Sequence, residues 1–471
     1  MCFTKRIILL FLITIYLSAN AQKQTGLIKQ TTQSTNGYVL FAPLYSKTTY
    51  LIDKCGNEIH SWKSKYIPGQ SVYLLPNGSL LRTCTDSVPT FAGDGGKIEK
   101  LDWNSKVLWQ YSLSNKRERR HHDVYPMPNG NVLMLVWEKK SREEAIKAGR
   151  DSMYAGEGLW NEKIIELKPV GTNSAIVVWE WSVWDHLIQD VNTNGLHYGV
   201  ISENPQLINI NYSTASVPDW LHFNSVVFNP AINQILVSNR NFGELFIIDH
   251  STTIKQAASH SGGLRNKGGD LLYRWGNPES YNQGSVVDKK LFNQHSAFWI
   301  ANGLKDAGKI MVFNNGLDRP GGQYSSVEVI VTPINKNGTY DLTKGKAFLP
   351  DDAEWKYSDS IPVNFYSRNV SSAQRLSNGN TLICEGANGK FFEIDKTNKI
   401  VWTYINPVSG NGIIKETKEN SRNQVFRCTL YEPNYSGLKS HLLTQGKPLV
   451  LDSLIPPCQI KGDIKLKQTG K

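Results

Sequence analysis

The chain has 471 residues, with 52 Lys or Arg against 41 Asp or Glu and a formal net charge of +11. The basic residues are scattered apart from one run, KRERR at 116–120, so the charge does not indicate nucleic-acid binding. We interpret that run as a solvated loop, with a weak attraction of anions as the alternative. No segment after the first 21 residues approaches the ~20 apolar residues that a membrane span needs.

The first 21 residues have the pattern of a secretory signal. Lys5 and Arg6 precede an apolar run at 7–17, and Ser-Ala-Asn-Ala follows at 18–21. This order of charge, apolar run and small residues predicts cleavage before Gln22. Removal of Lys5 and Arg6 leaves 50 basic residues against 41 acidic ones, or +9. We expect a soluble mature protein in the periplasm or secreted.

The mature chain keeps an odd number of cysteines without a CxxC or zinc-type spacing: Cys55, Cys84, Cys384, Cys428 and Cys458. In an oxidising compartment at least one of them is therefore free. Their pairing cannot be deduced from the sequence, and we interpret them as structural.

Six strand-rich units follow one another along the chain, each ending on aromatic residues. These residues are Trp62, Trp109 with Tyr111, Trp179 with Trp181, Tyr273 with Trp275, Trp355 with Tyr357, and Trp402 with Tyr404. Hairpin turns recur inside the units, as Asn77-Gly78, Asn129-Gly130, Asn229-Pro230 and Asn378-Gly379. Asn-Gly between apolar runs is the strongest short hairpin signal in a sequence.

This repetition predicts an all-β fold, a six-bladed β-propeller. A β-sandwich with long insertions is the alternative, but it does not explain the aromatic end of every unit, which we interpret as packing between blades. The first unit, 37–63, looks one strand short, and a strand at 423–431 follows the sixth unit. We therefore expect this C-terminal strand to close the ring.

The expected organisation is a signal peptide at 1–21, a linker at 22–36, the propeller at 37–450 and a tail at 451–471. The longest insertion, at about 138–153, is charged and contains alanine. We expect it to form a helix on one face.

Candidate site residues lie where the innermost strand of each blade begins, because these positions converge at one mouth of a propeller channel. In chain order they are Gln70-Ser71, His121-His122-Asp123, His222 with Asn224, Gln294-His295, and Tyr366-Ser367-Arg368. Histidine occurs in three of these units, although the whole chain has only 10 histidines. This concentration predicts a functional site.

Two chemistries fit that set. Three histidines with an open position suit catalytic zinc, with Asp123 and Asp219 as outer partners. The neighbouring amides and guanidinium suit a bound oxyanion better, and a neutral imidazole is also a competent nucleophile. These groups belong to Asn224, Gln294, Asn314, Asn315 and Arg319. No nucleotide-binding glycine loop and no GxSxG elbow is present, so we expect no cofactor.

Several motifs occur in an order that resembles the bacterial aryl-sulfate sulfotransferase family. They are DWLHFNS at 219–225, SNRNF at 238–242, IDHS at 248–251, QH at 294–295, VFNNG at 312–316 followed by Arg319, YSSV at 324–327, and AQRLSNGNTL at 373–382. The resemblance implies an exported six-bladed propeller that moves a sulfuryl group from a phenolic sulfate ester to another phenol. It also implies a ping-pong route through a sulfated histidine, without a nucleotide donor.

Residue roles follow from the matching motifs. His222 and His295 look like the family's two histidines that hold the sulfuryl oxygens or assist proton transfer, and Arg319 looks like its charge-stabilising arginine. The family's nucleophilic histidine lies in a later blade, where this chain has only His441, outside any matching motif. We therefore predict that His122, His222 or His295 is the nucleophile, with His295 preferred.

The predicted function is aryl-sulfate sulfotransfer with a small aryl sulfate donor and a phenolic acceptor. His121, Asn224, Gln294, Asn315, Tyr366 and Arg368 are the expected substrate-binding residues. A ligand-binding propeller without catalysis is the alternative, and zinc-dependent hydrolysis is a third hypothesis. The sequence identifies neither the physiological substrates nor the oligomeric state.

Overall fold

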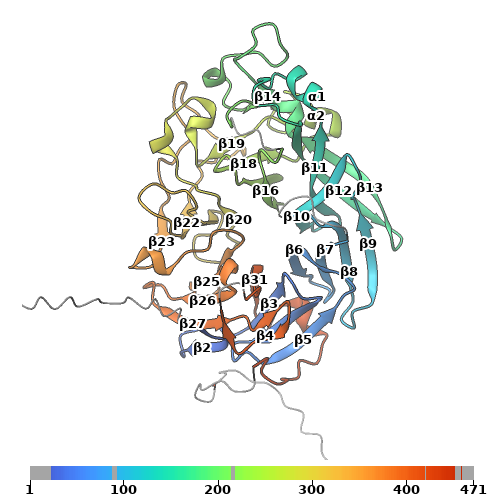
Figure 1. Ribbon diagram of the computed structural model, residues 1–471, viewed down its shortest axis with the longest axis vertical. Coiled ribbons are helices and arrows are strands. Elements are labelled where there is room, and N and C mark those ends of the chain that lie inside the picture. Colours follow the sequence, from blue (N-terminus) through green and yellow to red (C-terminus); the bar gives the residue numbers. More distant parts are fainter. Residues whose placement is uncertain (1–22, 87–92, 214–217, 419–420, 451–457, 459–471) are drawn as a thin grey trace, which may run out of the picture.

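A computed structural model describes residues 23–86, 93–213, 218–418, 421–450 and 458. Six antiparallel sheets surround a central axis, and the strands labelled β6, β10, β16, β20 and β31 line that axis (Figure 1). The chain is an all-β, six-bladed propeller, as the repeated units predicted. Among the described residues no helix is long and apolar enough to cross a membrane. The signal peptide lies outside the described residues.

The first three blades each contain four strands, in this order from the innermost strand outward. Blade 1 contains β31 (Val425–Tyr431), β3 (Tyr38–Pro43), β4 (Thr48–Asp53) and β5 (Glu58–Lys63). Blade 2 contains β6 (Ile67–Leu74), β7 (Leu80–Thr85), β8 (Gly96–Leu101) and β9 (Val107–Ser112). Blade 3 contains β10 (Glu118–Pro126), β11 (Val132–Lys140), β12 (Leu159–Val170) and β13 (Ser174–Ser182).

The other three blades follow the same order. Blade 4 contains β16 (Phe223–Asn229), β17 (Gln234–Asn239), β18 (Glu244–Asp249) and β19 (Tyr273–Trp275). Blade 5 contains β20 (His295–Trp299), β21 (Ile310–Asn314), β22 (Ser326–Ile330) and β23 (Trp355–Tyr357). Blade 6 contains β24 (Ser372–Arg375), β25 (Thr381–Glu385), β26 (Lys390–Ile394), β27 (Ile400–Ile405) and, outermost, β2 (Gly26–Gln30).

Short elements decorate the ring. The two-stranded pairs are β1 (Lys23–Gln24) with β30 (Glu416–Thr417), β14 (Leu187–Ile188) with β15 (Ile208–Asn209), and β28 (Val408–Ser409) with β29 (Gly412–Ile413). The α-helices are α1 (Arg142–Lys147), α2 (Ile254–Ala257) and α3 (Ser436–Lys439). The 3-10 helices are η1 (Val183–His186), η2 (Ile201–Glu203), η3 (Pro278–Tyr281), η4 (Val286–Asp288), η5 (Pro362–Asn364) and η6 (Gly386–Asn388). Helix α1 confirms the predicted insertion helix, and Ser141 and Glu144 form its capping box.

Both ends of the chain close the ring. Strand β31 pairs with β3, with Leu40 opposite Thr429, which confirms the predicted closure. At the other end, β2 pairs with β27 and Leu27 lies opposite Tyr404. The segment 22–36, which we expected to be a linker, thus supplies the fifth strand of blade 6. Burial of Leu27 in the core between blades 6 and 1 explains the difference.

The aromatic residues at the ends of the units join each blade to the next, as predicted. Four indole Nε1–H groups donate to backbone carbonyl oxygens: Trp109 to Ser174 O, Trp181 to Gly269 O, Trp275 to Pro350 O, and Trp402 to Lys54 O. Each of these acceptors belongs to the following blade or its connections. The indoles therefore add directed hydrogen bonds, each worth about 1 kcal/mol, to the apolar burial between blades.

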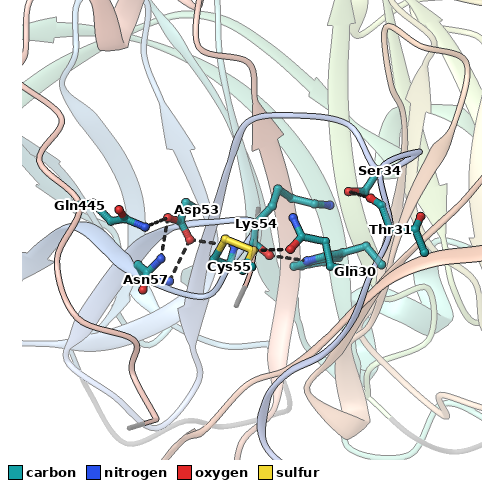
Figure 2. Close-up of a disulfide and its surroundings, with 10 residues drawn as sticks. Gln30, Thr31, Ser34, Asp53, Lys54, Cys55, Asn57 and Gln445 are labelled. Atoms are coloured by element: carbon teal, nitrogen blue, oxygen red, sulfur yellow. Dashed lines mark hydrogen bonds between the residues drawn. A yellow bond between two sulfur atoms is a disulfide. The ribbon is translucent and has the colours of Figure 1, made fainter. Parts of the chain in front are cut away.

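A disulfide joins Cys55 to Cys458 (Figure 2). Cys55 lies in the turn between β4 and β5, where the Asp53 carboxylate accepts from the backbone N–H of Cys55 (2.8 Å) and of Asn57 (2.9 Å). Cys458 is the described residue of the expected tail, so this cross-link ties the tail to blade 1. The other described cysteines are free and buried, namely Cys84, Cys384 and Cys428.

Candidate functional site

The innermost strands of blades 3, 4 and 5 begin with an interruption of the strand pairing. The register shifts between Arg120 and Val124, between Phe223 and Ser225, and between His295 and Phe298. Within or beside these shifts, the backbone φ is +41° at His122, +60° at His222 and +55° at Ser296. Positive φ is uncommon and costly for residues other than glycine, and such positions cluster at functional sites.

The structure brings the predicted histidines together at this end of the channel. The rings of His122 and His222 lie 4.5 Å apart. Both His222 and His295 lower the pKa of His122 by charge repulsion, after burial, which is the largest cause. His122, His222 and His295 are 3%, 7% and 3% exposed. Side chains from three separate blades thus form one compact imidazole cluster.

Asn315 fixes the orientation of the His295 ring. The Asn315 amide nitrogen Nδ2 donates to Ser367 O (2.6 Å) and Val370 O (3.0 Å), so its Oδ1 is the acceptor for His295 Nδ1 at 2.7 Å. The carbonyl oxygen of Asn293, 3.1 Å from Nδ1, also requires a proton there. In neutral His295, the lone pair is therefore on Nε2.

His295 remains neutral at ordinary pH. Burial is the main cause that lowers its pKa to about 3, and the Arg240 guanidinium is the next. A buried, neutral imidazole with a free Nε2 lone pair is a nucleophile that needs no prior deprotonation.

His222 has a carboxylate partner. Its Nδ1 donates to Asp219 Oδ2 at 2.5 Å. The other ring nitrogen, Nε2, is therefore free to exchange a proton with a bound ligand. A carboxylate that orients the ring through one nitrogen, with the other nitrogen free, is the arrangement of a general acid or base. Asp219 comes from the loop before β16, three residues before the histidine that it orients.

His121 connects His122 to a buried glutamate, Glu162 on β12. His121 Nδ1 and His122 Nδ1 are 3.0 Å apart, and His121 Nε2 lies 2.9 Å from Glu162 Oε2, a close approach rather than an aligned hydrogen bond. Burial raises the pKa of Glu162 well above its usual range and lowers the pKa of both histidines well below theirs. Burial thus favours the neutral form of all three groups.

Gly93 lets the backbone approach the His122 ring. The His122 N–H donates to Gly93 O at 2.8 Å. A Cβ at position 93, whose φ is +92°, would lie 1.9 Å from the imidazole. Any side chain at Gly93 would displace His122, so glycine is required on steric grounds.

Arg240 is a site residue that we did not predict from the sequence. It follows β17, donates its backbone N–H to His222 O (3.2 Å), and is close enough to His295 to lower the pKa of that imidazole. The predicted arginine, Arg319, donates through Nη2 to Ser326 Oγ (3.0 Å) and packs 4.3 Å from the centre of the Tyr324 ring. The SNRNF motif at 238–242 could have identified Arg240, because it places an arginine among polar residues directly after a predicted buried strand. An arginine is unusual in such a buried environment.

The other predicted residues have two kinds of environment. Gln294 and Asn224 are completely buried, and Gln294 Nε2 donates to Asn239 O (2.8 Å) and Glu244 O (3.0 Å). This amide therefore holds blades 4 and 5 together. Tyr366 is half-buried and Arg368 is exposed, in a loop before β24.

The sixth blade differs from its expected form. We expected the inner strand to begin at Tyr366-Ser367-Arg368, but β24 begins only at Ser372. Positive φ at Val370 (+50°) and Ser371 (+90°) interrupts the extended backbone before it. The late histidine, His441, lies outside this region and stacks on Trp103, with ring centres 3.8 Å apart.

An ion pair lies in the channel beyond the histidines. Arg427 Nη2 donates to Asp123 Oδ2 at 2.9 Å, the Tyr73 hydroxyl donates to Asp123 Oδ1 at 3.0 Å, and both charged groups are buried. Asp123 therefore faces away from His122, as alternation along a strand predicts. A cavity of about 230 Å³ lies at the opposite ends of the inner strands, lined by Tyr73, Phe298 and Arg427 among others, so it is separate from the histidine cluster.

The fold is a six-bladed β-propeller with a buried histidine cluster at one mouth of its channel. The chain belongs to the arylsulfotransferase (ASST) family, whose model matches residues 24–435. Membership supports aryl sulfotransferase activity in general.

Similar solved structures are distant. A protein of unknown function from Bacteroides caccae is 12% identical, with 84% of this chain and 99% of that chain covered and a TM-score of 0.45. A streptogramin B lyase is 10% identical, with 87% and 94% covered and a TM-score of 0.39. A putative 6-phosphogluconolactonase from Bacteroides fragilis is 10% identical, with 85% and 99% covered and a TM-score of 0.37. No curated protein matches the sequence.

Proposed function

We propose that this protein transfers a sulfuryl group from a phenolic sulfate ester to a phenolic acceptor through a sulfated His295, without a nucleotide donor or cofactor. The observation that carries the proposal is the fixed tautomer of His295, in which Nδ1–H donates to Asn315 Oδ1 and Nε2 keeps its lone pair. Burial and Arg240 keep the ring neutral.

In the first half-reaction, His295 Nε2 attacks the sulfur atom, the N–S bond forms, and the S–O bond to the phenol breaks. The leaving phenolate takes a proton from His222, whose Nδ1 stays hydrogen-bonded to Asp219. In the second half-reaction, His222 removes the proton of an acceptor phenol, whose oxygen attacks sulfur and breaks the N–S bond. One imidazole thus serves as acid and then as base.

Charge on the sulfuryl oxygens requires cationic or N–H donors that are already in place. Arg240 is the guanidinium beside His295. His121 Nδ1 lies 3.0 Å from His122 Nδ1. When His121 donates across this contact, His122 carries its proton on Nε2 and supplies a second donor. Arg319, Tyr366 and Arg368 would contact the aryl group or its ester from the rim.

The test is an assay of purified protein with a chromogenic phenyl sulfate, with and without a phenol acceptor. Release of the chromogenic phenol should require the acceptor beyond the first turnover and should survive a chelator. Acceptor-independent release that a chelator abolishes would instead indicate a metal hydrolase. No release with a wide range of donors would indicate a ligand-binding propeller.

Arg240→Gln is expected to lower kcat/KM for the donor by about 10²–10³, the usual loss when one charge-stabilising donor is removed. Arg319→Gln should cost less, because the Arg240 charge lowers the pKa of His295, whereas the Arg319 guanidinium donates to Ser326 Oγ and packs on Tyr324. Steady-state kinetics of both variants, with Tm as a check on folding, decide this. A larger loss in Arg319→Gln would assign the main charge-stabilising role to Arg319, as the resemblance implied.

We also propose that the mature protein acts in the periplasm or outside the cell, on the basis of the signal-like residues 1–21. An oxidising compartment agrees with the disulfide between Cys55 and Cys458.

A further inference from the structure

A second group of histidines lies at the outer side of the ring, between blades 3 and 4. His186 ends η1, which follows the last strand of blade 3. His260 and Asp270 belong to the connection between α2 and β19 of blade 4. Both of these elements are labelled in Figure 1. This group shares no residue with the cluster in the channel, and the proposed sulfuryl transfer does not use it.

Three potential metal ligands converge in this group. Asp270 Oδ1 lies 2.9 Å from His186 Nδ1 and 2.7 Å from His260 Nδ1. One ligand atom from each residue lies within 4.8 Å of the other two, and this is the only such group of three in the described part of the chain. Two imidazoles and one carboxylate are a common ligand set for zinc.

The hydrogen bonds of His186 determine which of its nitrogens can bind a cation. Its Nε2 lies 2.8 Å from Ala257 O, and a carbonyl oxygen only accepts, so the proton is on Nε2. In neutral His186, Nδ1 therefore directs a lone pair at Asp270 Oδ1, which is itself an acceptor. Two acceptors at 2.9 Å require a cation between them, either a proton or a metal ion.

The surroundings of His186 are those of a metal ligand. A ligating histidine usually donates its other N–H to a carbonyl or carboxylate, as His186 does to Ala257. Trp181 lies parallel to the imidazole, with ring centres 5.7 Å apart. Gly269 passes so close that a Cβ there would lie 2.5 Å from His186 Nε2. The ring is therefore held from three sides.

Access for an ion comes from the solvent side. The side chains of His186 and Asp270 are 0% and 5% exposed, whereas that of His260 is 61% exposed. Zinc bonds of about 2.0–2.1 Å in a tetrahedron place neighbouring ligand atoms roughly 3.3 Å apart. The 2.7 Å between His260 and Asp270 would have to widen by about half an ångström, which the exposed His260 can accommodate. The 2.9 Å between His186 and Asp270 would have to widen by a similar amount through a small movement of the Asp270 carboxylate.

We propose that His186 Nδ1, His260 Nδ1 and the Asp270 carboxylate bind a divalent transition-metal ion of the zinc type, with a fourth position open to water. The ion cross-links the end of blade 3 to the α2–β19 connection of blade 4. Because it adds an interaction that the unfolded chain lacks, binding stabilises the propeller.

The test uses the full mature chain, stripped with a chelator and incubated with Zn²⁺ before gel filtration and elemental analysis. We expect one zinc ion per chain, a Tm several degrees higher than that of the stripped protein, and the visible absorption of a four-coordinate ion when Co²⁺ replaces Zn²⁺.

His260→Ala and Asp270→Asn should each weaken zinc binding by more than the ~10–100-fold that loss of an outer hydrogen-bond partner costs. His260 is largely exposed, so its variant should keep the Tm of the stripped wild type. His250→Ala is the matched control, because His250 pairs with one carboxylate, Glu166, at 2.8 Å without a second histidine. It should bind zinc normally.

Three results would overturn the proposal. The first is zinc binding that is absent or substoichiometric in the wild type. The cation between His186 Nδ1 and Asp270 Oδ1 would then be a proton. The second is unchanged binding in His260→Ala. The third is loss of binding in His122→Ala but not in His260→Ala, which would place the ion in the channel. None of these results depends on the aryl sulfate assay.

Discussion

His295→Ala is expected to abolish aryl sulfate turnover, with a loss of about 10⁴-fold or more, because it removes the atom that accepts the sulfuryl group. The decisive measurement is mass mapping of wild-type protein that has been mixed with donor alone and quenched at alkaline pH. The added sulfuryl mass should lie on the peptide that contains His295. Since the pKa of His295 is about 3, protonation of this ring should not reduce labelling between about pH 8 and pH 5.

Asn315→Ala provides a control for this assignment, because it removes the acceptor for Nδ1 but keeps the nucleophile. It should slow the reaction and still give a labelled His295. Loss of activity in His295→Ala alone does not identify the nucleophile, since loss of a sulfuryl-binding group has the same effect. Labelling of His122, His222, Tyr366 or Ser367, or an active enzyme that is never labelled, would refute the role of His295.

Deletion of residues 423–471 is expected to give an insoluble protein. It removes β31, which leaves the edge of β3 unpaired and open to aggregation. It also removes Arg427 and leaves Asp123 buried without its cation, which by itself costs about 3–5 kcal/mol. A typical domain is stable by only about 5–15 kcal/mol. Solubility after expression and the melting temperature are the measurements.

A chain that ends at residue 450 is the matched control. It keeps β31 and the Arg427–Asp123 pair but lacks Cys458 and therefore the disulfide. It should remain soluble with a lower Tm, so the comparison separates strand closure from the cross-link. If the chain that ends at 422 were soluble with the Tm of the intact protein, β31 would not close the ring.

Local patterns made most of the fold predictable. Asn-Gly turns and terminal aromatics marked the blades, and the incomplete first unit indicated that β31 returns to it. Strand β2 was missed because only its first two residues, Gly26 and Leu27, are buried, so it lacks a clear apolar alternation. Its position depends on a partner, β27, that lies far along the chain.

The site was predictable in its residue types but not in its proton positions. His122, His222 and His295 were found because they occupy equivalent places in successive blades. Glu162, on another strand, was not predicted, and Asn315 was predicted to bind substrate rather than to accept from His295 Nδ1. No spacing in the sequence reveals these pairings. Which ring nitrogen carries a proton depends on those partners, and the nucleophile could therefore be argued only from the folded structure.

The meeting of both chain ends at blades 6 and 1 sets an order of events during synthesis. Strands β3, β4 and β5 are made early, yet their sheet lacks its innermost member until residues 425–431 have been added. The sheet of blade 1 therefore cannot be completed until almost the entire chain has been synthesised. The cross-link from Cys55 to Cys458 can form only after that. A chain that terminates before residue 425 lacks both the strand and the bond, and one that terminates between 432 and 457 lacks the bond alone. Formation of this disulfide therefore distinguishes finished molecules from incomplete ones.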